Sequence, residues 1–204
     1  MVKIPRISLM LLFIFGLLTR GVAESDAYTL DLLGVGWNKP EVTVLIKTEG
    51  RISQDALFNV EQAIDDWNEV LLTINDAPVL NLVREGERAD IVIHMKVGAG
   101  TAVGKTVWRA IGCSLKSVSI QLSSKAFGRT ISDSGTRNVA RHELGHALGL
   151  AHSDDPDDLM HAVADSSAIF RDIDLPISPC DEDSIYEICP LPKDCILADS
   201  ISCE

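Results

Sequence analysis

The chain has 204 residues, of which 46% are hydrophobic and 24% are charged. This length and composition fit one globular domain, or at most two, and exclude a chain that is disordered throughout. With 18 basic and 30 acidic side chains, the net charge is −12. The excess of acid argues against a nucleic acid as the partner, because phosphate contacts need clustered lysine and arginine.

The first 23 residues have the pattern of a secretory signal peptide. Lys3 and Arg6 precede an apolar stretch over residues 7–18, and small residues lead to a cleavage site before Glu24. An uncleaved membrane anchor is the alternative, but a spanning helix needs about 20 apolar residues, and this stretch is shorter. We expect residues 1–23 to be removed and the protein to be secreted, with no stable insertion in a membrane afterwards.

The next hundred residues alternate between strand and helix patterns. Strands are predicted where apolar side chains recur at every second position, namely over residues 41–48, 79–83, 89–97, 105–108 and 117–122. A long amphipathic helix is predicted from Gln54, with Ser53 as its N-cap and apolar residues at helical spacing up to Leu71. The glycine-rich residues 98–104 are either a plain turn or part of a substrate cleft. This mixture predicts an α+β fold.

A second helix, predicted over residues 136–149, carries the chemistry of the chain. Residues 142–152 read H-E-x-x-H-x-x-G-x-x-H. Because His142 and His146 are four residues apart, both imidazoles leave the same face of the helix, one turn from each other. Gly149 can adopt the positive φ that ends a helix, so that the chain turns and brings His152 back toward the first two histidines.

Three imidazoles at this spacing predict a zinc site. They would bind one tetrahedral ion and leave its fourth position open, which is the pattern of a catalytic site and not of a structural one. Glu143 adjoins the first histidine and is predicted to project beside the metal, where it would act as the general base on a water molecule. The predicted metal ligands are therefore His142, His146 and His152, and the predicted catalytic residue is Glu143.

Other interpretations of the motif are open. The histidines could be packing or capping groups, but three of only five histidines fall within eleven residues. A zinc-binding or adhesion module without activity would have little need of Glu143. A different H-E-x-x-H enzyme would use a downstream glutamate as its third ligand, and His152 argues against that reading.

The motif resembles that of the metzincin zinc endopeptidases, whose second hallmark is a methionine beneath the metal. Met160 lies at the matching place, and Ser153 after the third histidine resembles the matrixins, the group that contains the matrix metalloproteinases. Weaker similarity extends over about residues 37–189. The resemblance implies a zincin-like fold, with a twisted mixed sheet of about five strands, two long helices and a small C-terminal subdomain. It also implies a zinc endopeptidase that acts on protein or peptide substrates. We expect the protein to be a monomer.

The resemblance also gives an expected organisation: a catalytic domain over residues 24–179 and a C-terminal helix and cysteine-rich tail over 180–204. By analogy with the family, an extended substrate lies along the strand at 105–108. Its side-chain preference depends on the wall after Met160, residues 161–176, where Ile169, Phe170 and Leu175 are apolar. We expect an apolar preference.

The chain also departs from the family. No cysteine lies between Glu24 and Trp37, so an inhibitory propeptide of the cysteine-switch type is not expected. We interpret His94 and His161 as ordinary polar residues, which leaves one zinc ion and no second, structural one. An acidic run, residues 154–158, could bind Ca²⁺, but it lacks the EF-hand spacing and is better read as a solvated loop.

Four of the five cysteines, Cys180, Cys189, Cys195 and Cys203, crowd the last 25 residues, whereas Cys113 stands alone. In an oxidising compartment the cluster predicts a disulfide staple, whereas zinc binding by the tail lacks a Cys-x-x-Cys pair. Three pairings of the four are open. A helix over 181–189 would hold its ends about 13 Å apart, which disfavours a bridge between Cys180 and Cys189.

Overall fold

The structure is a computed structural model that describes residues 27–98, 102–162, 166–191 and 197–203. The predicted signal peptide, Cys195 and the middle of the predicted glycine-rich turn at 98–104 lie outside these ranges. Within them, no helix is both long and apolar enough to cross a membrane.

The main sheet has five strands in the order β3-β2-β4-β6-β5. Four of them run parallel, and β5 joins the edge antiparallel to β6. Their bounds are β2 Glu41–Glu49, β3 Val79–Leu82, β4 Ile91–Lys96, β5 Gly104–Ile111 and β6 Ser114–Ser123. All five predicted strands are present. The last two are longer than predicted, because they continue into a hairpin around Gly112, whose φ is +58°.

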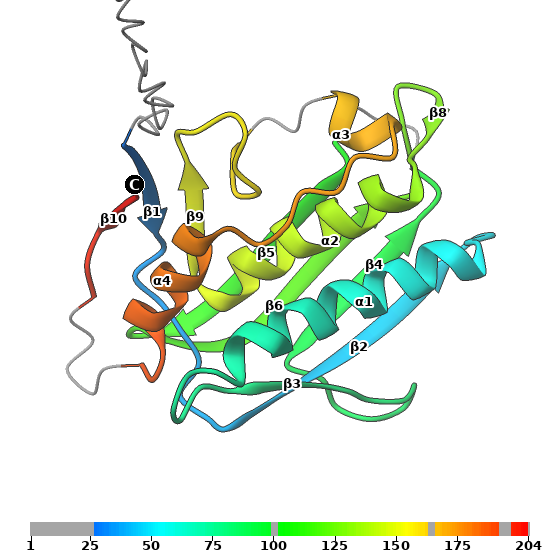
Figure 1. The fold of residues 1–204 in the computed structure, drawn as a ribbon. Helices are drawn as coiled ribbons and strands as arrows, with labels where there is room; N and C mark the ends of the chain where they lie inside the picture. Colours follow the sequence, from blue (N-terminus) through cyan, green and yellow to red (C-terminus); the bar gives the residue numbers. More distant parts are fainter. Residues whose placement is uncertain (1–26, 99–101, 163–165, 192–196, 204) are drawn as a thin grey trace, which may run out of the picture.

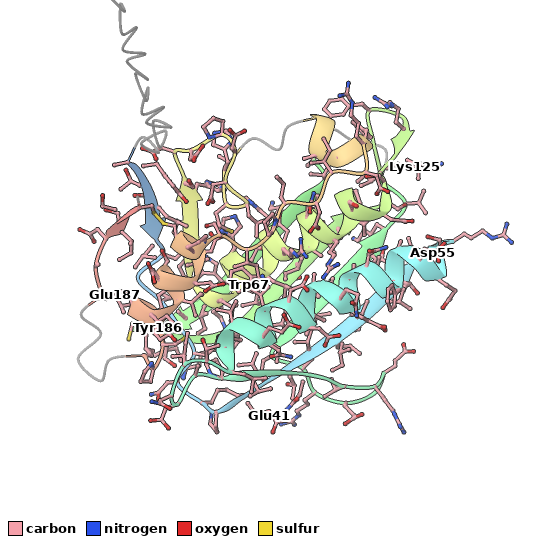
Figure 2. The ribbon with its side chains drawn as sticks, viewed as in Figure 1. Glu41, Asp55, Trp67, Lys125, Tyr186 and Glu187 are labelled. Carbon is pink, nitrogen blue, oxygen red and sulfur yellow. A yellow bond between two sulfur atoms is a disulfide. The ribbon has the colours of Figure 1, made fainter. Side chains whose placement is uncertain are left out.

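Two long helices, α1 (Gln54–Leu71) and α2 (Asp133–Leu148), pack side by side on one face of this sheet (Figure 1). The predicted N-cap is confirmed, since the Ser53 side chain accepts a hydrogen bond from the backbone N–H of Ala56. Helix α2 begins three residues before the predicted start because Ser132 caps it in the same way. Trp67, labelled in Figure 2, is fully buried and donates its indole N–H to the carbonyl of Arg141 on α2, at 2.9 Å.

A second, smaller sheet was not predicted. It has the order β10-β1-β9, with β1 Tyr28–Leu32, β9 Leu150–Ser153 and β10 Ser200–Cys203. Each strand is only four or five residues long, too short for alternation to mark it. The remaining elements are the hairpin of β7 (Lys125–Ala126) and β8 (Arg129–Thr130), the short helix α3 (Ser166–Phe170) and α4 (Pro179–Ile188).

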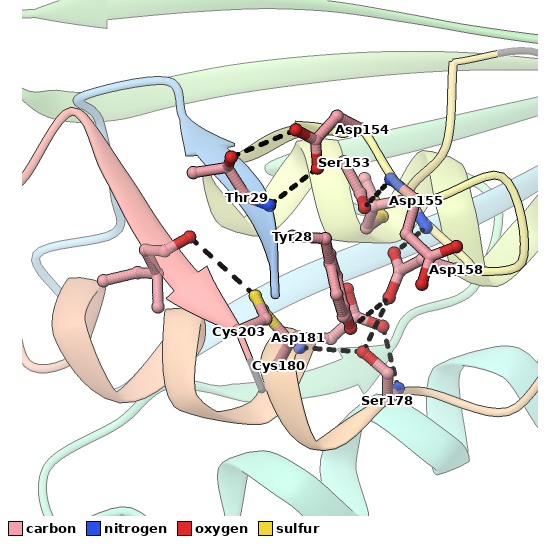
Figure 3. The surroundings of a disulfide bond; sticks show 12 residues. Tyr28, Thr29, Ser153, Asp154, Asp155, Asp158, Ser178, Cys180, Asp181 and Cys203 are labelled. Atoms are coloured by element: carbon pink, nitrogen blue, oxygen red, sulfur yellow. Dashed lines mark hydrogen bonds between the residues drawn. A yellow bond between two sulfur atoms is a disulfide. The ribbon is translucent and has the colours of Figure 1, made fainter. Parts of the chain in front are cut away.

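The C-terminal part of the chain is stapled by a disulfide between Cys180 and Cys203 (Figure 3). The expectation that Cys180 does not pair with Cys189 is confirmed, and Cys189 is a buried free thiol. Cys113 is disulfide-bonded as well. Ile185 and Ile188 of α4 belong to the main hydrophobic core. The α+β class, the five-stranded mixed sheet and the two long helices are therefore confirmed, whereas the boundary at residue 180 stays a prediction.

Candidate active site

The three histidines of the motif converge at the C-terminal end of α2. His142 and His146 project from one face of this helix, which ends at Gly149 with φ of +117°. The left-handed conformation is needed here, and a Cβ at this position would also lie 2.3 Å from the carbonyl oxygen of Val35. The chain then turns into β9, which carries His152. The predicted turn at Gly149 is confirmed.

One possible ligand atom from each of His142, His146 and His152 lies within 4.8 Å of the other two. The Nδ1 of His142 is 2.8 Å from the carbonyl oxygen of Leu159, and that of His146 is 2.9 Å from the carbonyl oxygen of Leu150. Since a carbonyl oxygen only accepts, each Nδ1 must carry the proton, which leaves Nε2 free to bind a metal.

The electrostatics of the site favour neutral imidazoles. Burial lowers the pKa of His142 to about 4, and it also lowers the pKa of His146 and His152. Metal binding requires the neutral form, which these shifts favour at neutral pH. The residues present therefore fit a zinc ion: three neutral nitrogen donors at close range, two of them oriented by backbone carbonyls.

Glu143 lies beside the histidines but is not part of the ligand group. It is 5% exposed, and its Oε2 accepts a hydrogen bond from the hydroxyl of Thr106 on β5, at 2.6 Å. Burial raises the pKa of this carboxyl to about 7. A carboxyl with a pKa near 7 can both accept and return a proton under physiological conditions.

Met160 is fully buried against α2, at a residue that lies between the two histidines of that helix in sequence. Its sulfur packs against Gly145 of α2, where an added Cβ would lie only 2.5 Å from the sulfur. The backbone N–H of Met160 donates to Asp158, and the neighbouring carbonyl of Leu159 accepts from His142. The turn that contains Met160 thus fixes the orientation of the His142 ring through the carbonyl of Leu159.

A cavity of about 590 Å³ opens beside His142 and Glu143. Residues 168–175, which we call the pocket wall, close one side of it, with Ile169 and Leu175 among the lining residues as the sequence predicted. Phe170 instead packs edge-on against Phe127. Phe127 itself lines the cavity, as do Val103, Val139, Leu159 and Ile173. The cavity can therefore accept an apolar side chain.

The remaining polar residues of the prediction lie in varied settings. His94 on β4 lies beside Glu49, with 3.4 Å between Nδ1 and Oε1, away from the three histidines. His161, however, lines the cavity. Asp158 of the acidic run is buried, contrary to the expectation of a solvated loop, because it accepts hydrogen bonds from Met160, Tyr28 and Ser178.

Sequence reasoning missed Thr106 and Asn138, both of which meet the site. Thr106 was part of a predicted strand, but nothing in the strand pattern indicated that it reaches Glu143. Asn138 lies one turn before His142 and lines the cavity. Its neighbours Arg137 and Arg141 are also polar, so nothing in the sequence distinguished Asn138 from a solvated helix residue.

Comparisons with known proteins agree with this geometry. The matrixin family model matches residues 123–187, which contain the whole motif and Met160. Among 118 solved chains that match, the structure of myroilysin has 15% sequence identity and a TM-score of 0.50, and the match covers 79% of this chain and 98% of that one. At this identity the likeness establishes the fold alone. No curated protein matches.

The fold and the site are similar to those of the matrixin-like metzincins, whose family model matches the part of the chain that contains the motif. The chain is a zinc metalloendopeptidase, an enzyme that acts on proteins or peptides.

Proposed function

We propose that this chain is a secreted endopeptidase in which His142, His146 and His152 hold the catalytic zinc ion and Glu143 is the general base. The observation that carries the proposal is how the three histidines and Glu143 are arranged at the end of α2. Three neutral imidazoles face one another, while the buried carboxyl group of Glu143 beside them is bound by Thr106 and is not part of the ligand group. The signal-like first 23 residues and the disulfides support export to an oxidising compartment.

Bound zinc supplies Lewis-acid chemistry, which makes a water molecule more acidic and polarises the scissile carbonyl. Glu143 takes a proton from the attacking water on its carboxylate and later returns it to the leaving amine nitrogen. The raised pKa of this group suits both transfers. No serine or cysteine nucleophile is needed.

The substrate is proposed to bind as an extended strand along β5. This strand is the last in the main sheet, so its outer edge presents backbone groups that can pair with a peptide. The cavity beside Glu143 would then take one substrate side chain, and its Ile169 and Leu175 favour an apolar one.

The test compares bound zinc with peptide hydrolysis for the same proteins. Glu143→Ala should keep one zinc ion per chain and its fold, while cleavage of a quenched peptide falls by roughly 10²–10⁴ or more. Glu143→Asp should lose about 10², because one missing methylene moves the carboxylate by about an ångström.

His152→Ala should instead lose zinc affinity and activity together, since two imidazoles hold the ion poorly. In the wild type, a chelator should abolish cleavage and added zinc should restore it. A wild-type protein that binds zinc and cleaves nothing, or a fully active Glu143→Ala variant, would contradict the proposal.

A further inference from the structure

The inner face of β5 presents two residues to Glu143. Gly104 and Thr106 are two positions apart, so they lie on the same face of the strand. Both are half-buried, whereas Lys105 and Val107 between and beyond them are exposed. The face that these two residues share is the one against α2, and Glu143 is the α2 residue they meet.

Thr106 contacts Glu143 through its hydroxyl. The hydroxyl donates to Oε2 at 2.6 Å and lies 3.1 Å from the backbone carbonyl oxygen of the same residue. Hydrogen bonds from a hydroxyl to a carboxylate are short and about twice as strong as those between neutral groups. Because Glu143 is 5% exposed, this bond is sheltered from competition with bulk water.

Gly104 contacts the other oxygen of the same carboxylate. A Cβ built at this glycine would lie 2.2 Å from Oε1 and 2.7 Å from the carboxyl carbon of Glu143. Any side chain at residue 104 would therefore displace the carboxylate. One oxygen is thus fixed by a donor, and the other occupies space that only a glycine leaves open.

We propose that β5 sets the position of the catalytic carboxylate, with Thr106 as a positioning residue for Glu143 and Gly104 as the residue that makes room for it. The inference rests on the proposed function, in which Glu143 is the general base. It adds that β5, the strand along which the substrate is proposed to pair, also positions the carboxylate of Glu143. One strand would then position both the substrate and the general base. Misplacement by about an ångström costs on the order of 10² in rate.

The experiment uses the zinc-loaded protein and three substitutions of threonine. Thr106→Val keeps the shape of the side chain but removes the hydroxyl, and should lower kcat about tenfold to a hundredfold with little change in KM. Thr106→Ser keeps the hydroxyl and should recover most of that loss. Thr43→Val is the matched control. It removes a hydroxyl on β2 that donates to the carboxylate of Asp90, just before β4, at 2.8 Å. This change lies away from Glu143 and should leave kcat unchanged.

Two readouts do not depend on turnover. All three variants should retain one zinc ion per chain, and a crystal structure of Thr106→Val should show the Glu143 carboxylate moved from its wild-type position. Gly104→Ala should displace the same carboxylate by steric contact. If Thr106→Val had wild-type kcat, or if its carboxylate had not moved, the positioning role would be wrong while the function of Glu143 stood. A failure of the proposed function would be seen in other proteins: wild type would bind zinc and cleave nothing, or Glu143→Ala would be fully active.

Discussion

Two carboxyl groups, those of Asp158 and Asp181, are buried where the Met160 turn meets the start of α4 (Figure 3). Ser178 joins them, since its hydroxyl donates to Asp158 and its backbone N–H donates to Asp181, both at 2.8 Å. The second oxygen of Asp181 has no hydrogen-bond partner among the described residues. Burial, and then the nearby charge of Asp158, raise the pKa of Asp181 to about 7.

This shift makes the stability of the protein depend on pH. The folded state holds the proton of Asp181 up to about pH 7, whereas the unfolded chain releases it near pH 4. At this group the folded state therefore binds more protons across the window, so the contribution of Asp181 to the free energy of unfolding falls as pH rises from about 4 to about 7. Asp181→Asn cannot ionise, so its stability relative to wild type should increase over the same range.

Denaturant unfolding at a series of pH values tests this prediction. Asp183→Asn is the control, because Asp183 is on the same helix but exposed. Its curve should run parallel to that of wild type. A difference between Asp181→Asn and wild type that stays constant from pH 4 to 7 would show that Asp181 keeps an ordinary pKa.

Residues of the site divide into those that local spacing predicts and those that it does not. Helical periodicity alone fixes the relative directions of His142, Glu143 and His146, so these could be placed from the sequence. Gly149 could be placed because a glycine after the last turn is the usual end of a helix. Thr106 could not, since its contact with Glu143 depends on the register of β5 and on how α2 crosses the sheet. Asp181 could not either, because an acidic residue in the first turn of a helix is ordinarily a solvated one.

At the level of elements, the first half of α2 clamps the pocket wall (residues 168–175). Asn138 donates to the carbonyls of Ile173 and Ala168, at 2.8 and 3.3 Å, and accepts from the N–H of Leu175 at 2.9 Å. Gly135 allows the wall to approach, since an added Cβ would lie 2.2 Å from the carbonyl oxygen of Ile169. The same helix thus carries two histidines and fixes the width of the cavity beside them.

Asn138→Ala should change which substrates are preferred. Without these three hydrogen bonds the wall is held less firmly at the cavity, although Ser132 and Arg141 still bond it. The ratio of kcat/KM between peptides with a large and a small apolar side chain should therefore fall by about tenfold. Ser134→Ala is the control, because it removes an exposed hydrogen bond from α2 to Asp172 on the same wall, away from the cavity. Equal selectivity ratios in wild type and Asn138→Ala, measured with matched peptides, would mean that the clamp does not set specificity.

The elements themselves were predicted where their patterns are long. Strands β2, β4 and β6 alternate over six or more residues, and α1 shows apolar residues over 18. The small sheet was missed because β1, β9 and β10 come from three distant parts of the chain, and each is too short to show a period. Pairing between such segments is decided by the folded chain as a whole and not by local preference.

On the scale of the whole molecule, that small sheet links the first and last described strands to the candidate metal site. Strand β1 pairs with β10 on one side and with β9, which carries His152, on the other. The disulfide from Cys180 to Cys203 fastens β10 to α4, whose side chains reach the main core. The four tail cysteines left three pairings open because nothing in the sequence indicated that the last strand returns to β1.

Removing this disulfide should lower stability without abolishing the site. Closing a loop with a sequence separation of 23 restricts the unfolded chain, and the chain-entropy estimate gives about 3 kcal/mol. The free energy of unfolding of the double variant Cys180→Ser, Cys203→Ser should therefore be lower by about 3 kcal/mol, measured as a lower urea midpoint. It should still bind one zinc ion at 25 °C, because β9 also pairs with β1 and His152 follows directly from α2.

Cys189→Ala is the control. It removes only a free thiol and should lower the free energy of unfolding by less. If the double variant unfolded at the same urea concentration as wild type, the core alone would hold the tail. If it lost zinc while still folded, the staple would be needed to place His152.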